Sequence, residues 1–495
     1  MSKLIIQNGN MCELDLPLKF AQKLYNEFAI RHPNAFYLRT RQRGMQNWDG
    51  KIHYITKTGQ FKIGLLPKVY DMCIEMGIKP KVVDMRQPLP KVSKVVTNIG
   101  KYKLRPEQEK AVKSVINNRV GDTPFHIGVL DYTVNAGKTL IMSSLYLTYK
   151  KQLKTLLITN DSDWLNQARE EFKQYLPGED ITFVQGKVLN WSNFTIGMVQ
   201  SISRNMRFYQ KELSQIDMVL VDEADQGGSK QYQNVITRLF NTRIRIGLSG
   251  TIYMSKLAKD KVKNMNLECF FGKVIAEFKL KDSIKKGYST KTIVKMVPGK
   301  PWYGNWESDC ISYKEIYDDS ITENNTAWTM AYNRLRWNIN QGRYPALVVC
   351  KHIAHCENLY KFFKKKLGDA YNIAYVHVNT PSKLRQQIMR DFREGKIDIL
   401  VSTTIIARGK NFPKLRYLLN TASMDSQEKS IQFLGRLVRT DKSKKKVYLD
   451  DLHYPGPYLD RHGKHRKQYY QRQELKVILL DKLWKKHPNH SLIKS

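Results

Sequence analysis

The sequence has no long uninterrupted apolar run. A membrane-spanning helix needs about 18 to 20 such residues, and no segment of the 495-residue chain approaches that length. The first residues, MSKLIIQNGNMCEL, also lack the extended apolar core of a secretory signal. We therefore expect no membrane contact and a protein that acts in a reducing cytoplasm.

Cysteine and acidic residues are both scarce. Six cysteines lie at positions 12, 73, 269, 310, 350 and 356, too thinly scattered for a disulfide framework, so we expect free thiols. Only 45 Asp and Glu residues stand against 83 Lys and Arg residues, which gives a formal net charge of +38. A surface this basic attracts polyanions, and nucleic acid is the expected partner.

The order of apolar and polar stretches predicts several domains. A small α+β domain for substrate recognition is expected over residues 1–95, ending in the linker RQPLPKVSKVV. Two α/β lobes follow, over 96–287 and 288–455, because short apolar runs alternate with helical stretches there. These runs are HIGVL, TLLITN, FTIGMVQ, MVLVDEAD and RIRIGLSGT in the first lobe, and PALVVCKH, IAYVHV, DILVSTT, LRYLLNTA and KKVYLDDL in the second.

A basic helical extension is expected over residues 456–495. The segment from Lys464 to Lys486 has apolar residues at the spacing of one helical face. We expect this helix to pack on the second lobe. The apolar positions are Leu475, Ile478, Leu479 and Leu483.

The segment YTVNAGKT, from Tyr132 to Thr139, is typical of a phosphate-binding loop. It lies between a predicted strand and a predicted helix, and it ends in Gly137, Lys138 and Thr139. Such residues provide close backbone approach to phosphate, a cation for the β- and γ-phosphates and a hydroxyl for Mg²⁺. Tyr132 stands where the full pattern has its first glycine, so the motif alone leaves a chance surface turn open.

The segment VLVDEAD strengthens the prediction of a nucleotide site. An apolar strand that ends in adjacent carboxylates can place Asp222 near the magnesium ion and Glu223 near the attacking water. In the second lobe, QFLGRLVR is predicted to be helical, with Gln432 and Arg436 one turn apart and Arg439 on the same side. These arginines could stabilise charge on the γ-phosphoryl group.

As an ordered set, these motifs resemble those of superfamily 2 helicases. The set comprises LRPEQ, NAGKT, TND with WLNQ, VQSI, DEAD, LSGT, VSTTIIARGKNF and QFLGRLVR. The resemblance implies two tandem RecA-like lobes that use ATP and Mg²⁺. It assigns Gln108 to the adenine edge, and Asn135, Ala136, Gly137, Lys138 and Thr139 to the phosphates. It further assigns Thr139 and Asp222 to the metal, and Gln200, Ser201, Ser249, Thr251, Thr403 and Thr404 to coupling with nucleic acid.

Within that superfamily the chain resembles the UvsW-like helicases of T-even phages and the XPB-like and type III restriction group. LSGT and QFLGR differ from the SAT and HRIGR of DEAD-box RNA helicases, whereas MQNWDGKIHYI, FKIGLLP and ALVVCKHIAHCENLY resemble UvsW-like segments. The chain departs from the family at Asn135, where Gly or Ser is usual, and at residues 408–411, where GxD is more common.

Three further features allow two interpretations. Cys350, His352, His355 and Cys356 could hold zinc, but they span a strand and a helix, so buried structural residues are favoured. Trp48 could stack on a base, although the following DG favours a core aromatic above a hairpin turn. Basic residues near the C-terminus could be solvated or could contact phosphates. They are Lys442, Lys444, Lys445, Lys446, Lys464, Arg466 and Lys467.

Together these features predict an ATP-dependent DNA helicase or translocase that remodels forks or junctions in replication, recombination and repair. A monomer is expected, and the resemblance implies a phage protein in a bacterial cytoplasm. An RNA helicase is the alternative within enzymes, because the tetrapeptide DEAD is present. A non-catalytic DNA-binding or annealing scaffold is the alternative from another class.

Overall fold

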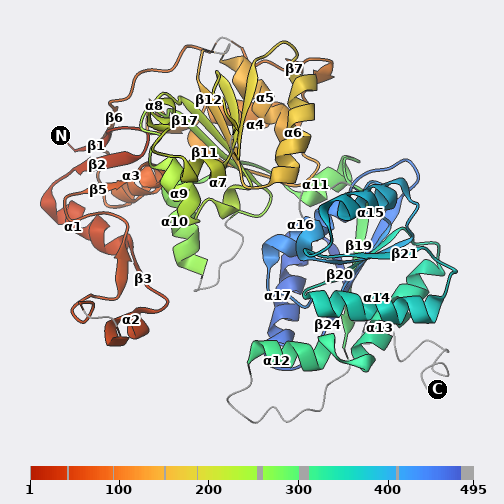
Figure 1. Cartoon of the computed structure of the whole chain (residues 1–495). Coiled ribbons are helices and arrows are strands. Elements are labelled where there is room, and N and C mark those ends of the chain that lie inside the picture. Colours follow the sequence, from red (N-terminus) through yellow and green to blue (C-terminus); the bar gives the residue numbers. More distant parts are fainter. Residues whose placement is uncertain are drawn as a thin grey trace. The chain divides into compact units, whose positions relative to one another are not determined.

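The computed structural model describes residues 2–41, 44–92, 94–149, 152–186, 188–252, 260–299, 312–407 and 412–480. The chain divides into two compact units, Met1–Phe278 and Lys279–Ser495, and each is described by itself below (Figure 1). In the part of the chain that is described, no helix combines the length and the apolar character needed to cross a bilayer.

The first unit begins with a four-stranded sheet in the order β5-β2-β1-β6. β1 pairs antiparallel with β2 and parallel with β6, and β2 pairs antiparallel with β5. Leu4 and Ile6 of β1 are fully buried, because alternate side chains of a strand point to one face. The expected α+β arrangement is confirmed. Its elements are β1 (Lys3–Ile6), β2 (Met11–Asp15), α1 (Leu18–Glu27), β3 (Ala29–Arg31), α2 (Ala35–Arg41), β4 (Lys51–His53), β5 (Gln60–Lys62), α3 (Leu66–Glu75) and β6 (Lys81–Asp84).

A larger sheet follows, in the order β14-β13-β15-β12-β16-β17-β11-β18. All neighbours run parallel except β13 and β14. The central strands are buried on both faces, which explains their uninterrupted apolar sequences. The strands are β11 (Ile127–Tyr132), β12 (Thr155–Thr159), β13 (Ile181–Gln185), β14 (Val188–Leu189), β15 (Phe194–Met198), β16 (Met218–Asp222), β17 (Ile244–Ser249) and β18 (Val274–Phe278).

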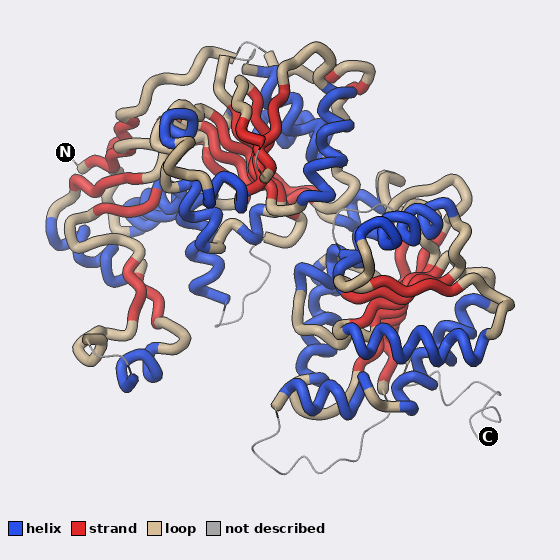
Figure 2. Tube along the Cα trace, viewed as in Figure 1, coloured by secondary structure: helices blue, strands red, loops and turns tan. Residues whose placement is uncertain are grey.

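Helices cover both faces of this sheet (Figure 2). Two short hairpins, β7 with β8 and β9 with β10, flank the first of these helices along the chain. The elements are β7 (Asn98–Ile99), β8 (Tyr102–Lys103), α4 (Pro106–Ile116), β9 (Arg119–Val120), β10 (Thr123–Pro124), α5 (Lys138–Thr148), α6 (Ser162–Tyr175), α7 (Val199–Arg204), α8 (Gln210–Ser214), α9 (Lys230–Ile236) and α10 (Lys261–Phe271).

A fully buried arginine joins the N-terminal segment to this sheet. Arg245 lies on β17, and its Nη2 donates to the Gly9 carbonyl at 2.6 Å and to Asn10 Oδ1 at 2.8 Å. Its Nη1 donates to the Phe270 carbonyl at 3.2 Å. Burial lowers the pKa of Arg245 to about 9. A Cβ on Gly64 would lie 2.1 Å from the Glu268 carbonyl oxygen, so the backbone of the N-terminal segment touches that of α10. The N-terminal segment and the larger sheet therefore form one unit.

The second unit contains a seven-stranded parallel sheet in the order β21-β22-β20-β23-β24-β19-β25. The expected strands of both lobes are confirmed, and so are two tandem parallel-sheet lobes. The strands are β19 (Lys291–Pro298), β20 (Ala346–Cys350), β21 (Ile373–Val376), β22 (Ile399–Thr403), β23 (Tyr417–Asn420), β24 (Lys446–His453) and β25 (Lys476–Leu479). The helices are α11 (Leu280–Lys285), α12 (Tyr313–Tyr317), α13 (Asn325–Ile339), α14 (Ile353–Leu367), α15 (Ser382–Glu394), α16 (Gln427–Leu437) and α17 (Leu459–Arg472).

The C-terminal segment differs from the expected single helix. A basic helix is present as α17, but it ends at Arg472, and Glu474 follows with a φ of 55°. Ile478 and Leu479 belong to β25, which pairs with β19 and forms the edge of the sheet, so their predicted place on a helical face is wrong. A short apolar run beside an open sheet edge gains backbone hydrogen bonds as a strand. Leu483 lies outside the described residues.

Two of the basic residues considered for phosphate contact are buried. Arg466 is fully buried and forms a two-pronged ion pair with Asp451, with Nη2 2.8 Å from Oδ1. Lys444 is also buried and donates to the carbonyl oxygens of Leu415 and Leu437. Burial lowers the pKa of Lys444 to about 8. These two side chains stabilise the second unit and do not face solvent.

Trp48 is half-buried rather than part of the core. Its Nε1 donates to the Lys51 carbonyl at 2.9 Å, and its ring meets the ring of His32 edge-on at 5.7 Å. β4 does pair antiparallel with β3, but the chain between them contains α2. The predicted tight hairpin at Asp49-Gly50 is therefore wrong. β4 pairs with β3, and residues 32–50, which include α2, lie between the two strands.

Candidate nucleotide and coupling site

The phosphate-binding loop connects β11 to α5. Gly137 precedes α5 with φ 71° and ψ 47°, and Asn135 has a φ of 65°. Both residues occupy the left-handed region, which Gly adopts freely and Asn tolerates better than most other residues. This explains why Asn135 can stand where related loops have Gly or Ser. The first-turn N–H groups of a helix lack intrahelical partners, so α5 begins at a site suited to phosphate oxygens.

The start of α4 holds this loop in place. Gln108 is 1% exposed, and its Nε2 donates to the Ala136 carbonyl at 2.9 Å. The Gln108 Oε1 accepts from the Arg105 backbone N–H at 2.9 Å, and the Arg105 Nη2 donates to the Asn135 carbonyl at 3.1 Å. Gln108 thus lies against the loop, with both ends of its amide engaged by the protein. Its role at the adenine edge stays a prediction.

The two adjacent carboxylates follow β16. Asp222 is buried, and its Oδ1 lies 4.0 Å from Lys138 Nζ. Burial raises the pKa of Asp222 above its usual range, and the Lys138 ammonium opposes that rise. Glu223 adopts a left-handed conformation, with φ 51° and ψ 48°, which is an uncommon conformation for a residue with a side chain. The backbone therefore turns sharply where the strand ends.

The oxygen atoms at this point fit a magnesium ion. Asp222 Oδ1 is buried and has no hydrogen-bond donor among the residues described. Thr139, with its hydroxyl, lies in the first turn of α5. Carboxylate and hydroxyl oxygens, together with phosphate oxygens of a nucleotide, are ligands that Mg²⁺ accepts. A bound Mg²⁺ would give Asp222 Oδ1, which accepts no hydrogen bond from the described residues, a direct ligand contact.

The end of β17 is hydrogen-bonded to the same carboxylate segment. Ser249 Oγ donates to Asp225 Oδ1 at 2.8 Å, and the Thr251 N–H donates to Ser249 Oγ at 3.1 Å. Asp225 is buried. Ser249, expected to couple nucleotide to nucleic acid, therefore contacts the DEAD segment directly, three residues beyond Asp222, and Thr251 is joined to it through Ser249.

Gln226, which the sequence analysis did not single out, and Asn160, in the segment TND, extend this connection. Gln226 Nε2 donates to Glu223 Oε2 at 3.3 Å, and Gln226 Oε1 accepts from Asn160 Nδ2. The Asn160 carbonyl accepts from Gln200 Nε2 at 3.4 Å. A chain of hydrogen bonds thus joins Glu223 to Gln200 on α7. The adjacent Ser201 Oγ accepts from the Gly186 N–H at 2.9 Å.

In the second unit, α16 carries two of the three expected residues. Gln432 and Arg436 lie one turn apart, and Arg436 is in the last turn. Arg439 lies beyond the helix, because α16 ends at Leu437 and Val438 caps it. The prediction that Arg439 shares a helical face with the other two is therefore wrong, and a turn at the helix end sets its position.

The expected coupling residues of the second unit follow β22. Thr403 is buried at the end of that strand, and Thr404 Oγ1 accepts from Lys429 Nζ at 3.2 Å. Lys429 belongs to α16, so this contact joins the coupling segment to the helix that carries Arg436. Residues 408–411, where the sequence departs from the family pattern, lie outside the described residues.

Cys and His side chains of ALVVCKHIAHCENLY make hydrogen bonds inside the second unit. His355 Nδ1 lies 3.2 Å from the Tyr317 hydroxyl, and Cys356 Sγ donates to the Val401 carbonyl at 3.6 Å. Burial lowers the pKa of His355 to about 3. Over the described ranges, no group of three or more His, Cys, Asp or Glu side chains is placed to hold a metal ion.

Two protein-family models match the chain. The model of the type III restriction enzyme res subunit matches residues 101–254, and the model of the helicase conserved C-terminal domain matches residues 331–441. The first match contains the phosphate-binding loop and the DEAD segment. The second contains β22 and α16. Each match thus falls on one of the two parallel-sheet lobes.

Individual relatives are distant. A protein of Sulfolobus islandicus filamentous virus that carries the name helicase 22 is 22% identical over 385 residues. The match covers 71% of this chain and 64% of the relative. The chain thus spans less than two thirds of the length of the curated relatives it matches.

Solved structures are similar to the chain at low sequence identity. The crystal structure of T4 UvsW is 19% identical with a TM-score of 0.45, covering 97% of this chain and 98% of that one. The structure of S. cerevisiae Dbp5 bound to RNA and ADP BeF3 is 14% identical with a TM-score of 0.52, covering 77% and 92%. Two matched family models in tandem, each on a lobe with its expected motifs, show that the chain belongs to the superfamily 2 helicases.

Proposed function

We propose that the chain is an ATP-dependent DNA helicase or translocase that remodels forked or junction DNA during replication, recombination and repair. The observation that carries this proposal is the meeting of Lys138 and Asp222 at 4.0 Å, with Glu223 joined by hydrogen bonds toward Gln200. A motor needs a phosphate site that is connected to a nucleic-acid-binding motif, because hydrolysis must change how tightly the motor binds the strand.

Each residue of the site has a proposed role in ATP hydrolysis. Lys138 and the backbone of the preceding loop bind the β- and γ-phosphates, and Thr139 and Asp222 hold Mg²⁺, which offsets phosphate charge. Glu223 orients the attacking water and accepts its proton. Gln432, Arg436 and Arg439 act on the γ-phosphoryl group from the second lobe. Asn135, Ala136 and Gly137 shape the loop, and Gln108 contacts the adenine.

Coupling to the nucleic acid is proposed through residues at strand ends. Gln200 and Ser201 in the first unit and Thr403 and Thr404 in the second would contact the backbone of one strand, without sequence readout. Ser249 and Thr251 would couple the state of the bound nucleotide to these strand-contacting residues. The hydrogen bond from Ser249 to Asp225 supports this proposal.

DNA is the proposed substrate because two observations favour it. The motifs LSGT and QFLGR differ from those of DEAD-box RNA helicases, and the first lobe matches a restriction-enzyme model. RNA unwinding is the second candidate, since the tetrapeptide DEAD is present and the fold resembles that of S. cerevisiae Dbp5 in its RNA-bound structure. The relative from a filamentous virus supports a viral origin. We further propose that the protein acts as a monomer in the cytoplasm of a bacterial host.

The test compares nucleic acids on the purified full chain. ATP hydrolysis is measured with single-stranded DNA, duplex DNA, forked DNA and single-stranded RNA, and strand displacement is measured on forks, Holliday junctions and overhang duplexes. Lys138→Ala is the control for contaminating hydrolysis. We expect DNA to stimulate hydrolysis and forks or junctions to be remodelled. Stimulation by RNA alone would establish the second candidate, and hydrolysis no greater than that of Lys138→Ala would indicate a non-catalytic scaffold.

A further inference from the structure

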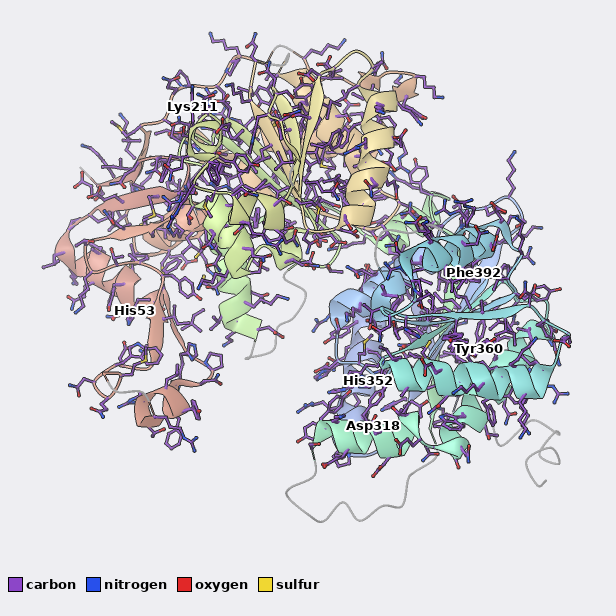
Figure 3. The ribbon with its side chains drawn as sticks, in the orientation of Figure 1. His53, Lys211, Asp318, His352, Tyr360 and Phe392 are labelled. Atoms are coloured by element: carbon purple, nitrogen blue, oxygen red, sulfur yellow. The ribbon has the colours of Figure 1, made fainter. Side chains whose placement is uncertain are left out.

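A narrow arm projects from the N-terminal sheet. β3 and β4 pair antiparallel over three residues each, and the chain between them carries α2. Figures 1 and 2 show this ribbon leaving the body of the first unit with α2 at its far end. His53 on β4 (Figure 3) stacks on Tyr25 of α1 at 4.1 Å and lies 2.7 Å from Asp49. These contacts fix the base of the arm.

The far end of this arm exposes large apolar side chains. Phe36 is 80% exposed and Tyr37 is 54% exposed, both on α2, and Met45 after it is 37% exposed. Burying an aromatic side chain of this size normally stabilises a protein. The fold forgoes that gain at Phe36, so the side chain is available to contact something outside the first unit.

The same arm is strongly basic. Residues 29–53 contain five Lys or Arg residues and one acidic residue, a net charge of +4 (5 − 1). The guanidinium of Arg41 lies 5.0 Å from the centre of the Tyr37 ring. The single carboxylate, Asp49, already accepts from the Lys51 N–H at 2.9 Å and pairs with His53. Exposed aromatic rings beside unopposed cations match the flat bases and the phosphates of nucleic acid.

We infer that the tip of this arm binds nucleic acid at the junction between single and double strands, with Phe36 packed on the exposed face of the terminal base pair. α2 has seven residues and is only about 10 Å long, so it contacts a point and does not follow a strand. Inside a duplex both faces of every base are covered by stacking. An aromatic tip therefore finds an open face where the stack ends. This inference rests on the proposed function, because it requires a branched nucleic acid.

The test uses Phe36→Ala in the full chain, with Leu18→Ala as a matched control. Leu18 is 81% exposed but lies at the far end of α1 from the arm. The affinity for forked DNA is measured without nucleotide, using 2-aminopurine in the terminal base pair to report stacking. Phe36→Ala should weaken fork binding about 5- to 140-fold, the range for loss of one base–aromatic stack. Phe36→Trp should retain binding, and Leu18→Ala should bind like the unmodified chain.

A second measurement separates this inference from the proposed function. ATP hydrolysis stimulated by single-stranded DNA should be unchanged in Phe36→Ala, while strand displacement on forks falls at least tenfold. Unchanged fork affinity in Phe36→Ala would overturn the inference and leave the DNA motor standing. An equal loss with single-stranded DNA would also overturn it, since the arm would then contact one strand. A change in oligomeric state, seen by light scattering, would identify the tip as a contact between copies and overturn it too.

Discussion

Replacing Gly137 with alanine would disturb the phosphate-binding loop in two separable ways. The backbone has φ 71°, and holding a residue with a Cβ in the left-handed region costs about 1 to 2 kcal/mol. The new Cβ would also lie 2.3 Å from Gln108 Nε2, so the Gln108 amide must swing away and lose its bond to the Ala136 carbonyl. Leaving a buried partner unsatisfied costs about 1 to 3 kcal/mol.

The two effects together destabilise the first unit by about 2 to 5 kcal/mol. In a domain of 150 to 250 residues this corresponds to a fall of about 4 to 20 °C in the melting midpoint. Gly178→Ala is the matched control, because Gly178 has a φ of 80° but open space around its Cβ. It should show the backbone cost alone. Nucleotide affinity, measured with a fluorescent ATP analogue, should fall in Gly137→Ala and not in Gly178→Ala.

A double substitution tests the contact with Gln108. In Gly137→Ala combined with Gln108→Ala the clash is gone, so the loss of stability should be smaller than the sum of the two single losses by about 0.5 to 3 kcal/mol. Thermal melting of the four proteins, with and without nucleotide, measures this coupling. Additivity of the two losses would show that Gln108 does not hold the loop, and the reasoning would fail.

The remaining predictions concern chemistry and stability. Glu223→Gln should keep ATP and DNA binding and lose turnover, because an amide cannot accept the proton of water; substantial residual hydrolysis would remove Glu223 from that role. Arg439→Ala should lower DNA-stimulated kcat at least about 10²-fold with little change in nucleotide affinity, and Arg439→Lys should not restore it; near-normal turnover would contradict this. Arg466→Met should destabilise the second unit by about 3 to 5 kcal/mol in thermal melting, because it leaves a buried carboxylate unpaired, while the partly exposed Lys467→Met should change stability by only about 0.5 kcal/mol. Burial lowers the pKa of His355 from 6.5 to about 3, so the unfolded chain takes up the proton first and stability falls as pH drops below 6.5. By pH 5 the loss is about 2 kcal/mol, and His355→Gln should remove this part of the acid sensitivity.

The sequence by itself determined the strands of both lobes and the order of the nucleotide motifs. Central parallel strands are buried on both faces, so a run such as MVLV is apolar throughout and can be recognised as a strand from the sequence alone. Because nucleotide-binding groups lie at the carboxyl ends of such strands, Lys138, Asp222 and Glu223 could be placed from their positions after HIGVL and MVLV. These are local properties, and neighbours distant in sequence do not alter them.

Tertiary structure alone decided the positions of individual polar side chains. Arg466 has the sequence context of a solvated helix residue, yet it is buried because Asp451 lies opposite it on β24. Arg245 is buried because the Gly9 carbonyl and the Asn10 side-chain oxygen, 235 positions or more away, accept its hydrogen bonds. The bond between Asn160 and Gln226 likewise joins segments 66 residues apart. A charged or polar group is stable inside a protein only where partners satisfy it, and the sequence near that group does not reveal which distant residues will do so.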